Sequence, residues 1–415
     1  MITFGGKSRR VEIAAAVSIF VFAGTGVGTA VAASASEDRT ALRMVSLLFR
    51  HSVISPKYNL PKLKTEWPMG YRQLTAIGIQ RTYESGLALR RRYVEELALI
   101  SAGYKMPEVY FRASNTDRSL QTAQVLALGL FPLGTGPDPS VYDITLKAAP
   151  TPELSFTPVP IHSVGLENDS VMRPWTSRAG CQKYRRYLNL LRKTKLYRAQ
   201  AKRFSPFLQR LSTITGINEG KKSAKILYQI NEIYESLSSN VAHNLPLPET
   251  ISAKDMELLR LLSDWNYHHQ FLGKKIGRLT GGPFVGKVVG NFSRHIKQPD
   301  KARRLYVYSG HQRTVLGVEA ALGIETARTE GPFYKGRVPP LGSHYAFELH
   351  ERAKGAYAVR LKFISEEGEK AITIPGCGGE FCPFNRFRSV AAEVVPKDWR
   401  TECEAKRARR GFFGR

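Results

Sequence analysis

Three widely separated segments of the chain repeat one pattern of hydrophobic and polar positions. In each, a short apolar run ends at an arginine or a histidine, and a polar loop then leads into a segment with helical spacing. The runs and the residues that follow them are Met44 to Phe49 with Arg50 and His51, Val109 to Phe111 with Arg112, and Leu305 to Tyr308 with His311. The pattern predicts three buried strands, each followed by an amphipathic helix.

The spacing also predicts where the helices begin and which side chains they bury. Thr75 and Thr314 are suited to cap the first and third helices, because a threonine hydroxyl accepts from the free backbone N–H groups of a first turn. The residues expected on the buried faces are Leu74, Ile77, Tyr83, Gly86 and Leu87 in the first helix, Leu120, Ala123, Ala127 and Leu130 in the second, and Val315, Val318 and Leu322 in the third.

Strand-then-helix units with short turns are typical of an α/β fold with a mostly parallel central sheet flanked by helices. Ligands of such folds gather beyond the carboxyl ends of the strands. The side chains predicted at that edge are Arg50, His51, Arg112 and His311. Two imidazoles and two guanidiniums make a poor core but suit a dianion such as phosphate, so we expect an anion-binding crevice there.

Between about Pro150 and Pro283 the sequence pattern becomes helical, and the segment is rich in lysine and arginine. Apolar residues recur at helical spacing in Ile226, Ile230, Ile233 and Leu237, and again from Met256 to Trp265. We interpret residues 151–283 as a helical cap inserted into the α/β core, which residues 36–150 and 284–404 would form. The lysines and arginines between residues 178 and 210 either line the crevice or belong to a solvated face.

Composition agrees with a folded, strongly basic protein. The chain has 415 residues, of which 42% are hydrophobic, and this excludes a disordered chain. Its formal net charge of +27 predicts attraction to anions, which include phosphorylated substrates, anionic surfaces and other polyanions. No nucleic-acid motif with interleaved aromatic residues is present, so no specific nucleic-acid partner is expected.

The first 35 residues have the pattern of a secretory signal peptide. Basic residues precede an uncharged stretch from Ile13 to Ala35, which closes on the small residues Ala33-Ser34-Ala35. The alternative is an uncleaved membrane anchor, since the stretch is long enough to span a bilayer. We expect the protein in the secretory pathway, either extracellular or lysosomal or endosomal. A basic tail, residues 405–415, ends the chain.

Four cysteines in a secreted chain indicate disulfides, with three connectivities open. They are Cys181, Cys377, Cys382 and Cys403. A zinc site is the rival interpretation, but no suitable histidine pair follows the cysteines, and no metal or other cofactor is expected. Asn168 and Asn291 begin glycosylation sequons, which are consistent with secretion.

These residues resemble the signature of the histidine acid phosphatases of the lysosomal and prostatic type. The family has RHGxRxP near the start and an HD dipeptide late in the chain, where this sequence has RHSVISP and YSGHQRTVLGVEAALG. The resemblance extends over nearly everything after the signal segment, through FRASNTDRSLQTAQ, PIHSV, RPW, RLTGGP and CPFNRFRSV to DWRTEC. It implies the pairings Cys377–Cys382 and Cys181–Cys403, and it identifies the helical insertion with the cap of the family.

The resemblance also implies a two-step phosphoryl transfer. His51 would attack phosphorus and form a phosphohistidine, while Arg50, Arg112 and His311 would bind the phosphoryl oxygens. Three family positions are substituted: Ser52 replaces a glycine, Ile54 replaces the second signature arginine, and Gln312 replaces the aspartate that protonates the leaving group. A lost general acid costs about a hundred- to ten-thousandfold for a leaving group that needs the proton. Replacement cations could come from Lys57, Arg72 or Arg313, although each is more simply a surface charge.

Three functions follow from this comparison. The first is a phosphomonoester hydrolase of reduced activity, and the second is a pseudophosphatase that binds a phosphorylated ligand without turnover. The third is a basic secreted protein that binds polyanions. The sequence leaves the oligomeric state open, and a homodimer is compatible with it.

Overall fold

The computed structural model describes residues 40–404, apart from positions 58, 64, 137–154, 176–179, 325–327, 331–332, 336–337 and 353–354. The predicted signal segment and basic tail lie outside the described residues. Those from Thr40 onward form one compact unit. Among the described residues, no helix is long and apolar enough to cross a membrane.

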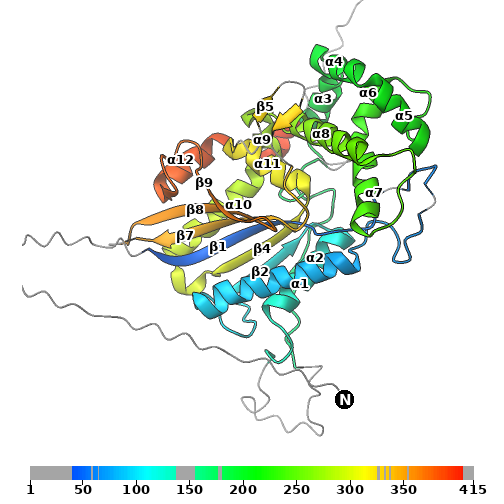
Figure 1. Ribbon diagram of the computed structural model, residues 1–415. Coiled ribbons are helices and arrows are strands. Elements are labelled where there is room, and N and C mark those ends of the chain that lie inside the picture. Colours follow the sequence, from blue (N-terminus) through cyan, green and yellow to red (C-terminus); the bar gives the residue numbers. More distant parts are fainter. Residues whose placement is uncertain are drawn as a thin grey trace, which may run out of the picture. The chain divides into compact units, whose positions relative to one another are not determined.

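A mixed β-sheet forms the centre of the fold (Figure 1). Its strands are β1 (Ala41–Arg50), β2 (Val109–Ala113), β3 (Ile161–His162), β4 (Leu305–Gly310), β7 (His344–Glu351), β8 (Tyr357–Ser365), β9 (Gly368–Ile372) and β10 (Phe381–Pro383). The order is β10-β8-β7-β1-β4-β2-β3, with β9 paired to β8. Neighbours among β1, β4, β2 and β3 pair in parallel, whereas β7, β8, β9 and β10 add antiparallel pairs. A separate hairpin pairs β5 (Arg328–Glu330) with β6 (Phe333–Lys335). The predicted α/β class with parallel central strands is confirmed.

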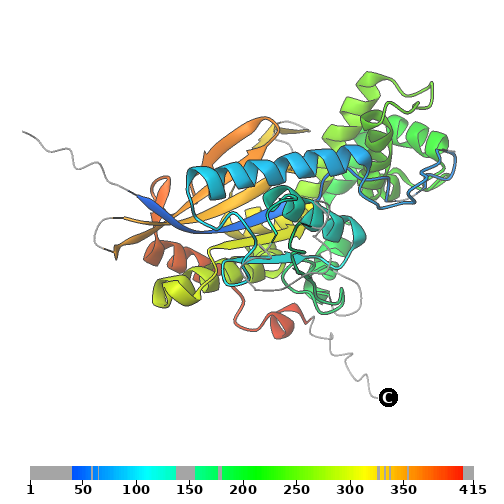
Figure 2. The ribbon, with the colours of Figure 1, turned by 90° about the horizontal axis from the view of Figure 1, so that it is seen from below.

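Helices cover both faces of the sheet (Figures 1 and 2). One apolar core lies beneath α1 (Ala76–Arg90) and α2 (Asp117–Leu130), and includes Leu89, Leu126 and Phe111. The other includes residues of α10 (Gly282–Lys297), α11 (Gln312–Leu322) and α12 (Phe384–Val394). Shorter helical pieces are η1 (Arg91–Glu96), α9 (Lys274–Thr280), η4 (Pro299–Lys301) and α13 (Trp399–Cys403).

The three predicted strand-then-helix units are present, with two differences of detail. Thr75 caps α1 as expected, since its side chain accepts from the Gly78 N–H. The third helix, α11, begins at Gln312 and is capped by His311, not by Thr314. Thr314 lies instead in the first turn, where its hydroxyl accepts from the His311 N–H and donates to the Met172 carbonyl. The N-cap position of α11 is therefore His311, one of the histidines of the predicted crevice.

The predicted buried face of helix α1 is confirmed only in part, since Leu74 and Gly86 are buried as expected but the rest of the face differs. Its buried residues are Gly78, Thr82, Gly86 and Leu89, whereas Ile77, Tyr83 and Leu87 are only partly buried. Glycine explains the rotation, because a Cβ on Gly78 would lie 2.1 Å from the Val53 carbonyl oxygen. The helix thus packs directly against the loop that follows His51 and fixes that loop in place.

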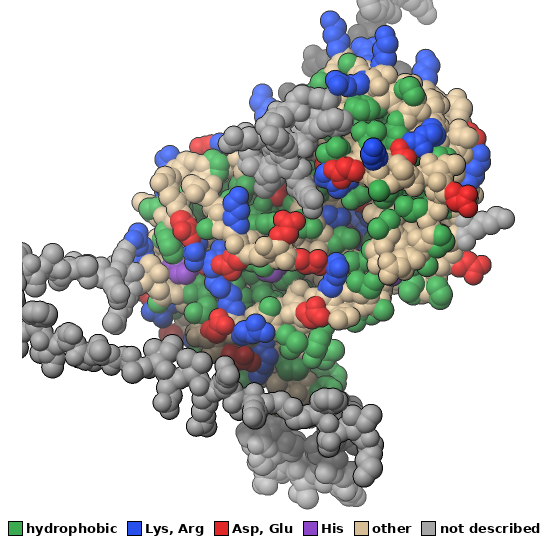
Figure 3. Space-filling view, in the orientation of Figure 1, with side chains coloured by type: hydrophobic (Ala, Val, Ile, Leu, Met, Phe, Trp, Pro, Cys, Tyr) green, Lys and Arg blue, Asp and Glu red, His purple; other side chains and the backbone are tan. Residues whose placement is uncertain are grey.

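The predicted cap contains the helices α3 (Gln182–Leu191), α4 (Lys195–Arg203), α5 (Ser205–Thr215), α6 (Ser223–Tyr228), α7 (Ile230–Ala242) and α8 (Ala253–Gln270). An apolar cluster that includes Ile226, Ile233 and Leu262 holds it together, and Leu60 of the loop after β1 belongs to the same cluster. The single helical run predicted from Ile226 to Leu237 is interrupted at Gln229, between α6 and α7. Figure 3 shows Lys and Arg side chains projecting from the end of the cap that carries α3 and α4.

Both disulfides implied by the family resemblance are present. Cys181 pairs with Cys403 and joins the start of α3 to the end of α13, while Cys377 pairs with Cys382 before α12. One sequon prediction is corrected: Asn291 is buried and its amide donates to the Tyr308 hydroxyl, so no glycan fits there in the folded chain. Asn168 is exposed.

Candidate functional site

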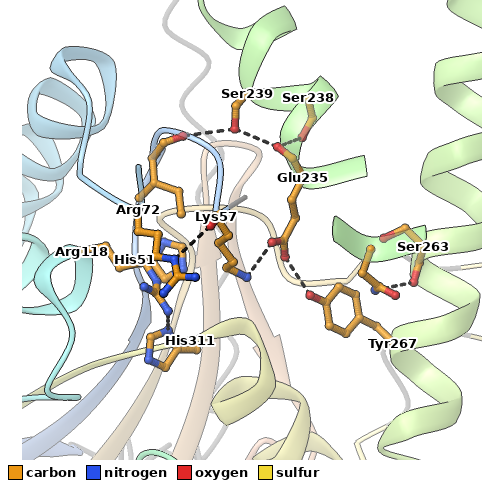
Figure 4. A network of polar contacts seen from close by, with 12 residues as sticks. His51, Lys57, Arg72, Arg118, Glu235, Ser238, Ser239, Ser263, Tyr267 and His311 are labelled. Carbon is orange, nitrogen blue, oxygen red and sulfur yellow. Dashed lines mark hydrogen bonds and ion pairs between the residues drawn. The ribbon is translucent and has the colours of Figure 1, made fainter. Parts of the chain in front are cut away.

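The two predicted histidines meet at the carboxyl ends of neighbouring parallel strands. His51 follows β1 and His311 follows β4, and these strands pair with Arg50 opposite Gly310. The His51 N–H donates to the Gly310 carbonyl, at 3.1 Å. The two imidazole centroids lie 5.6 Å apart with their planes 73° from parallel. Figure 4 shows both rings beside Lys57 and Arg118.

The surroundings of His51 favour a neutral, nucleophilic imidazole. Its Nδ1 lies 3.0 Å from the Ser52 carbonyl oxygen, which can only accept, so Nδ1 carries the proton and Nε2 keeps its lone pair. Burial lowers the pKa of His51 well below 6.5, and the cations Arg118, Arg50 and Lys57 lower it further. Attack by Nε2 on an electrophile therefore needs no prior loss of a proton.

His311 is held between two polar partners. A guanidinium can only donate, so Arg118 Nη2 donates to His311 Nδ1, 3.5 Å away. His311 Nε2 then carries the proton and donates to the Ser114 hydroxyl at 3.0 Å. Burial lowers the pKa of His311 well below 6.5, and Arg118 and His51 lower it further. Both histidines are thus neutral in a strongly cationic pocket.

The arginine of the second predicted unit that reaches the histidines is Arg118, not Arg112. Arg112 Nη2 instead forms a buried ion pair with Asp169 Oδ1, at 2.7 Å. Because strand side chains alternate, Phe111 faces the core under α2 and Arg112 points to the opposite side of the sheet. Arg118 lies in the first turn of α2 and lines the cavity around His51 and His311. The expectation that Arg112 joins the histidines is therefore corrected to Arg118.

We expect Asp169→Asn to lower the free energy of unfolding by about 3–5 kcal/mol, because it leaves the Arg112 guanidinium buried without its counter-charge. The loss is measurable as a lower urea midpoint. Asp300→Asn makes the same change at an exposed position and serves as the control, with no shift expected. An unchanged midpoint for Asp169→Asn would contradict the structural role of Arg112.

Arg50 lies beside His51 in sequence but faces a second cavity of about 280 Å³. Its Nη1 donates to the Pro339 carbonyl. Ile54 lines the same cavity, and its carbonyl accepts from the Ser239 hydroxyl of α7 at 3.2 Å. Burial lowers the pKa of Arg50, although nearby Glu235 opposes the shift. The second cavity adjoins the first, because both include His51 and Gln312 in their walls.

An ion pair between core and cap stands where the two cavities meet. Lys57, in the loop after β1, lies 2.6 Å from Glu235 of α7, which also accepts from the Tyr267 hydroxyl at 2.8 Å (Figure 4). Burial opposes ionisation of Glu235, but Lys57 outweighs it and holds the pKa of Glu235 below its usual value. Glu235 is therefore ionised, and its ion pair with Lys57 anchors the cap to the loop after β1.

The cavity around His51 and His311, the first of the two, has a volume of about 260 Å³ and a strongly cationic wall. Its charged side chains are Lys57, Arg72, Arg118, Arg173, Arg313, Glu232 and Glu235. All three residues considered as replacement cations are therefore in the wall. Arg173 was not foreseen, although it belongs to the RPW segment that resembles the family. The excess of cations suits an anionic ligand.

The three substituted positions differ in their access to the cavities. Gln312 lines both, and its amide oxygen is buried with no hydrogen-bond partner among the described residues. Ser52 lines neither, and its hydroxyl lies 3.6 Å from a Cβ built on Gly342. Ser52 thus faces the loop before β7 and not the cavities that His51 lines.

Three other histidines noted in the sequence, His162, His268 and His269, line neither of these cavities. His162 in β3 is exposed and stacks on Tyr110, with ring centroids 4.8 Å apart. His268 and His269 lie in α8, where His269 packs against Trp265. The described residues contain no group of three or more His, Cys, Asp or Glu placed to hold a metal ion.

Comparison with known proteins identifies the family of this chain. The family described as histidine phosphatase superfamily, branch 2, matches residues 32–364. Human lysosomal acid phosphatase is 30% identical over 372 residues, 88% of this chain and 80% of its own length. Human prostatic acid phosphatase is 28% identical over 382 residues, 89% of this chain and 90% of its own. The phytase of Citrobacter braakii shares the fold, with a TM-score of 0.63 at 15% identity over 89% of this chain and 100% of that one. The chain therefore belongs to branch 2 of the histidine phosphatase superfamily.

Proposed function

We propose that this protein hydrolyses phosphomonoesters through a phosphohistidine on His51. The supporting observation is the pairing of a neutral His51, whose Nε2 is free of a proton, with His311 and Arg118 in a cationic cavity. Phosphoryl transfer needs an in-line nucleophile and fixed positive charge around the phosphoryl oxygens. His51 supplies the first, and Arg118, Arg173 and Lys57 supply the second.

In the first step, His51 Nε2 bonds to phosphorus while the bond from phosphorus to the leaving oxygen breaks. Arg118 stabilises the charge on the equatorial oxygens as it shifts, and His311 accepts from Arg118 and holds its guanidinium in place. In the second step, water attacks the phosphohistidine, the phosphorus–nitrogen bond breaks, and phosphate leaves a neutral imidazole behind. The Nδ1 contact to the Ser52 carbonyl holds the ring in the required tautomer throughout.

Rapid quench of the wild-type protein with radiolabelled 4-nitrophenyl phosphate tests the proposal. We expect a burst of 4-nitrophenol and acid-labile, base-stable label on a peptide that contains His51. Heat-denatured protein gives the background. The absence of both label and 4-nitrophenol release would contradict hydrolysis.

A second candidate is a pseudophosphatase that binds a phosphorylated ligand without turnover. The observation in its favour is Gln312, which cannot supply a proton and whose buried amide oxygen has no hydrogen-bond partner in the part of the chain that the structure describes. The same quench separates the two functions, since a receptor binds 4-nitrophenyl phosphate without label on His51. Equilibrium dialysis with labelled phosphate would show the binding.

We also assign the protein to the secretory pathway, where disulfides form and persist. The supporting observation is that all four cysteines are paired.

A further inference from the structure

One carboxyl group in the cavity has no part in the proposed phosphate site. Glu232 of α7 lies in the same cavity wall as His51, His311 and Gln312. Its Oε2 atom is buried and has no hydrogen-bond partner among the described residues. A buried carboxyl oxygen without a partner is costly, and this one lies in the wall of the cavity that His51 lines, which points to a role in the chemistry.

The position of Glu232 follows from the helix that carries it. Ile230, Ile233 and Leu237 are fully buried in the cap and fix the rotation of α7 about its axis. Glu232, Glu235 and Ser239 share another face, at spacings of three and four residues. Glu235 pairs with Lys57 and Ser239 donates to the Ile54 carbonyl, so this face is anchored to the loop after His51 at two points.

The charged groups around Glu232 come from three elements. Arg313 approaches from α11, Lys57 from the loop after β1, and Glu235 from α7 itself. Burial and Glu235 raise the pKa of Glu232, Arg313 and Lys57 oppose the rise, and the result is a pKa of about 7. Glu235 has the opposite shift, because it is paired with Lys57. Two carboxyl groups one turn apart thus hold different protonation states in mildly acidic solution.

We propose that Glu232 is the general acid that protonates the leaving-group oxygen, in place of the aspartate whose position Gln312 occupies. The inference rests on the proposed hydrolase function and deepens it. As the bond from phosphorus to the alkoxide breaks, Glu232 gives its proton to the departing oxygen and becomes a carboxylate. When water attacks the phosphohistidine, the carboxylate takes the water proton, which restores Glu232 for the next cycle.

The test compares Glu232→Gln with the wild type on two substrates. 4-Nitrophenyl phosphate has a leaving group that departs without a proton, whereas 2-glycerol phosphate releases an alkoxide that needs one. The quantity measured is kcat/KM, which reports the steps up to alcohol release and not the later hydrolysis of the phosphohistidine. The matched control is Glu249→Gln, the same change at an exposed position of the cap.

We expect Glu232→Gln to lower kcat/KM for 2-glycerol phosphate by about 10²- to 10⁴-fold and that for 4-nitrophenyl phosphate by about tenfold or less. Because the protonated acid is the active form, wild-type kcat/KM for 2-glycerol phosphate should fall as the pH rises through about 7. For Glu232→Gln, the remaining kcat/KM for 2-glycerol phosphate should not fall as the pH rises through about 7. The control should keep both activities and the pH profile.

Equal losses on the two substrates, or no loss on 2-glycerol phosphate, would overturn the role of Glu232. So would a wild-type protein that cleaves 4-nitrophenyl phosphate but not 2-glycerol phosphate. Failure of the proposed function is distinguishable, because the wild type would then cleave neither substrate and form no phosphohistidine.

Discussion

Replacement of His51 by alanine should lower the rate of phosphomonoester hydrolysis by at least about 10⁴-fold and abolish the labelled phosphohistidine. The expected loss is large because the nucleophile is removed. Among the described side chains in the wall of the first cavity, the only other imidazole is that of His311. His311 uses Nε2 toward Ser114 and Nδ1 toward Arg118, so it is already engaged. The measurement is steady-state hydrolysis of 4-nitrophenyl phosphate together with the rapid quench.

The matched control for His51→Ala is His162→Ala. His162 is exposed and stacks on Tyr110 away from both cavities, so its loss should leave hydrolysis unchanged. His51→Ala should also bind inorganic phosphate, since Arg118 and Arg173 remain in the wall. If His51→Ala hydrolysed 4-nitrophenyl phosphate at the wild-type rate, the nucleophile would have to be another residue and the proposed mechanism would be wrong.

The second large effect concerns Arg118. We expect Arg118→Ala to lower kcat by about 10³- to 10⁵-fold, the range for an arginine that stabilises a transferring phosphoryl group. Its contact with His311 and its electrostatic effect on both histidines place its charge at the site of reaction. Removing that charge should also let the pKa values of His51 and His311 rise, because Arg118 depresses both.

Two variants sharpen the Arg118 experiment. Arg118→Lys keeps a positive charge but loses the planar fork, so its kcat should lie between those of the wild type and Arg118→Ala. Arg198→Ala removes an exposed arginine of α4 and should have no effect on kcat. A decrease of less than threefold in Arg118→Ala would show that other cations hold the phosphoryl group.

The ends of the strands were predictable because apolar runs that stop at a charged or histidine residue have one simple explanation. The positions of His51 and His311 follow from this pattern, since adjacent parallel strands must bring their carboxyl ends together. Arg112 was mispredicted for a reason visible in the same strand. A strand alternates its side chains, so a residue near the end of a strand, such as Arg112 in β2, can point away from the crevice while the first turn of the next helix points into it.

Other features depend on packing that a single sequence does not show. The rotation of α1 is set by the close approach of Gly78 to Val53, and small residues carry little signal in a hydrophobic pattern. The break at Gln229 has no proline or glycine to mark it. Glu232 is one acidic residue on an amphipathic helix, and only the anchoring of α7 through Glu235 and Ser239 shows which face meets His51.

The Cys181–Cys403 disulfide spans 222 residues, and this separation orders events during synthesis of the chain. At translation rates of about 5–20 residues per second, Cys181 is added to the chain roughly 10 to 45 s before Cys403. The cap helices therefore have time to fold while this thiol is still unpaired, and an oxidoreductase can close the bond only on a nearly complete polypeptide.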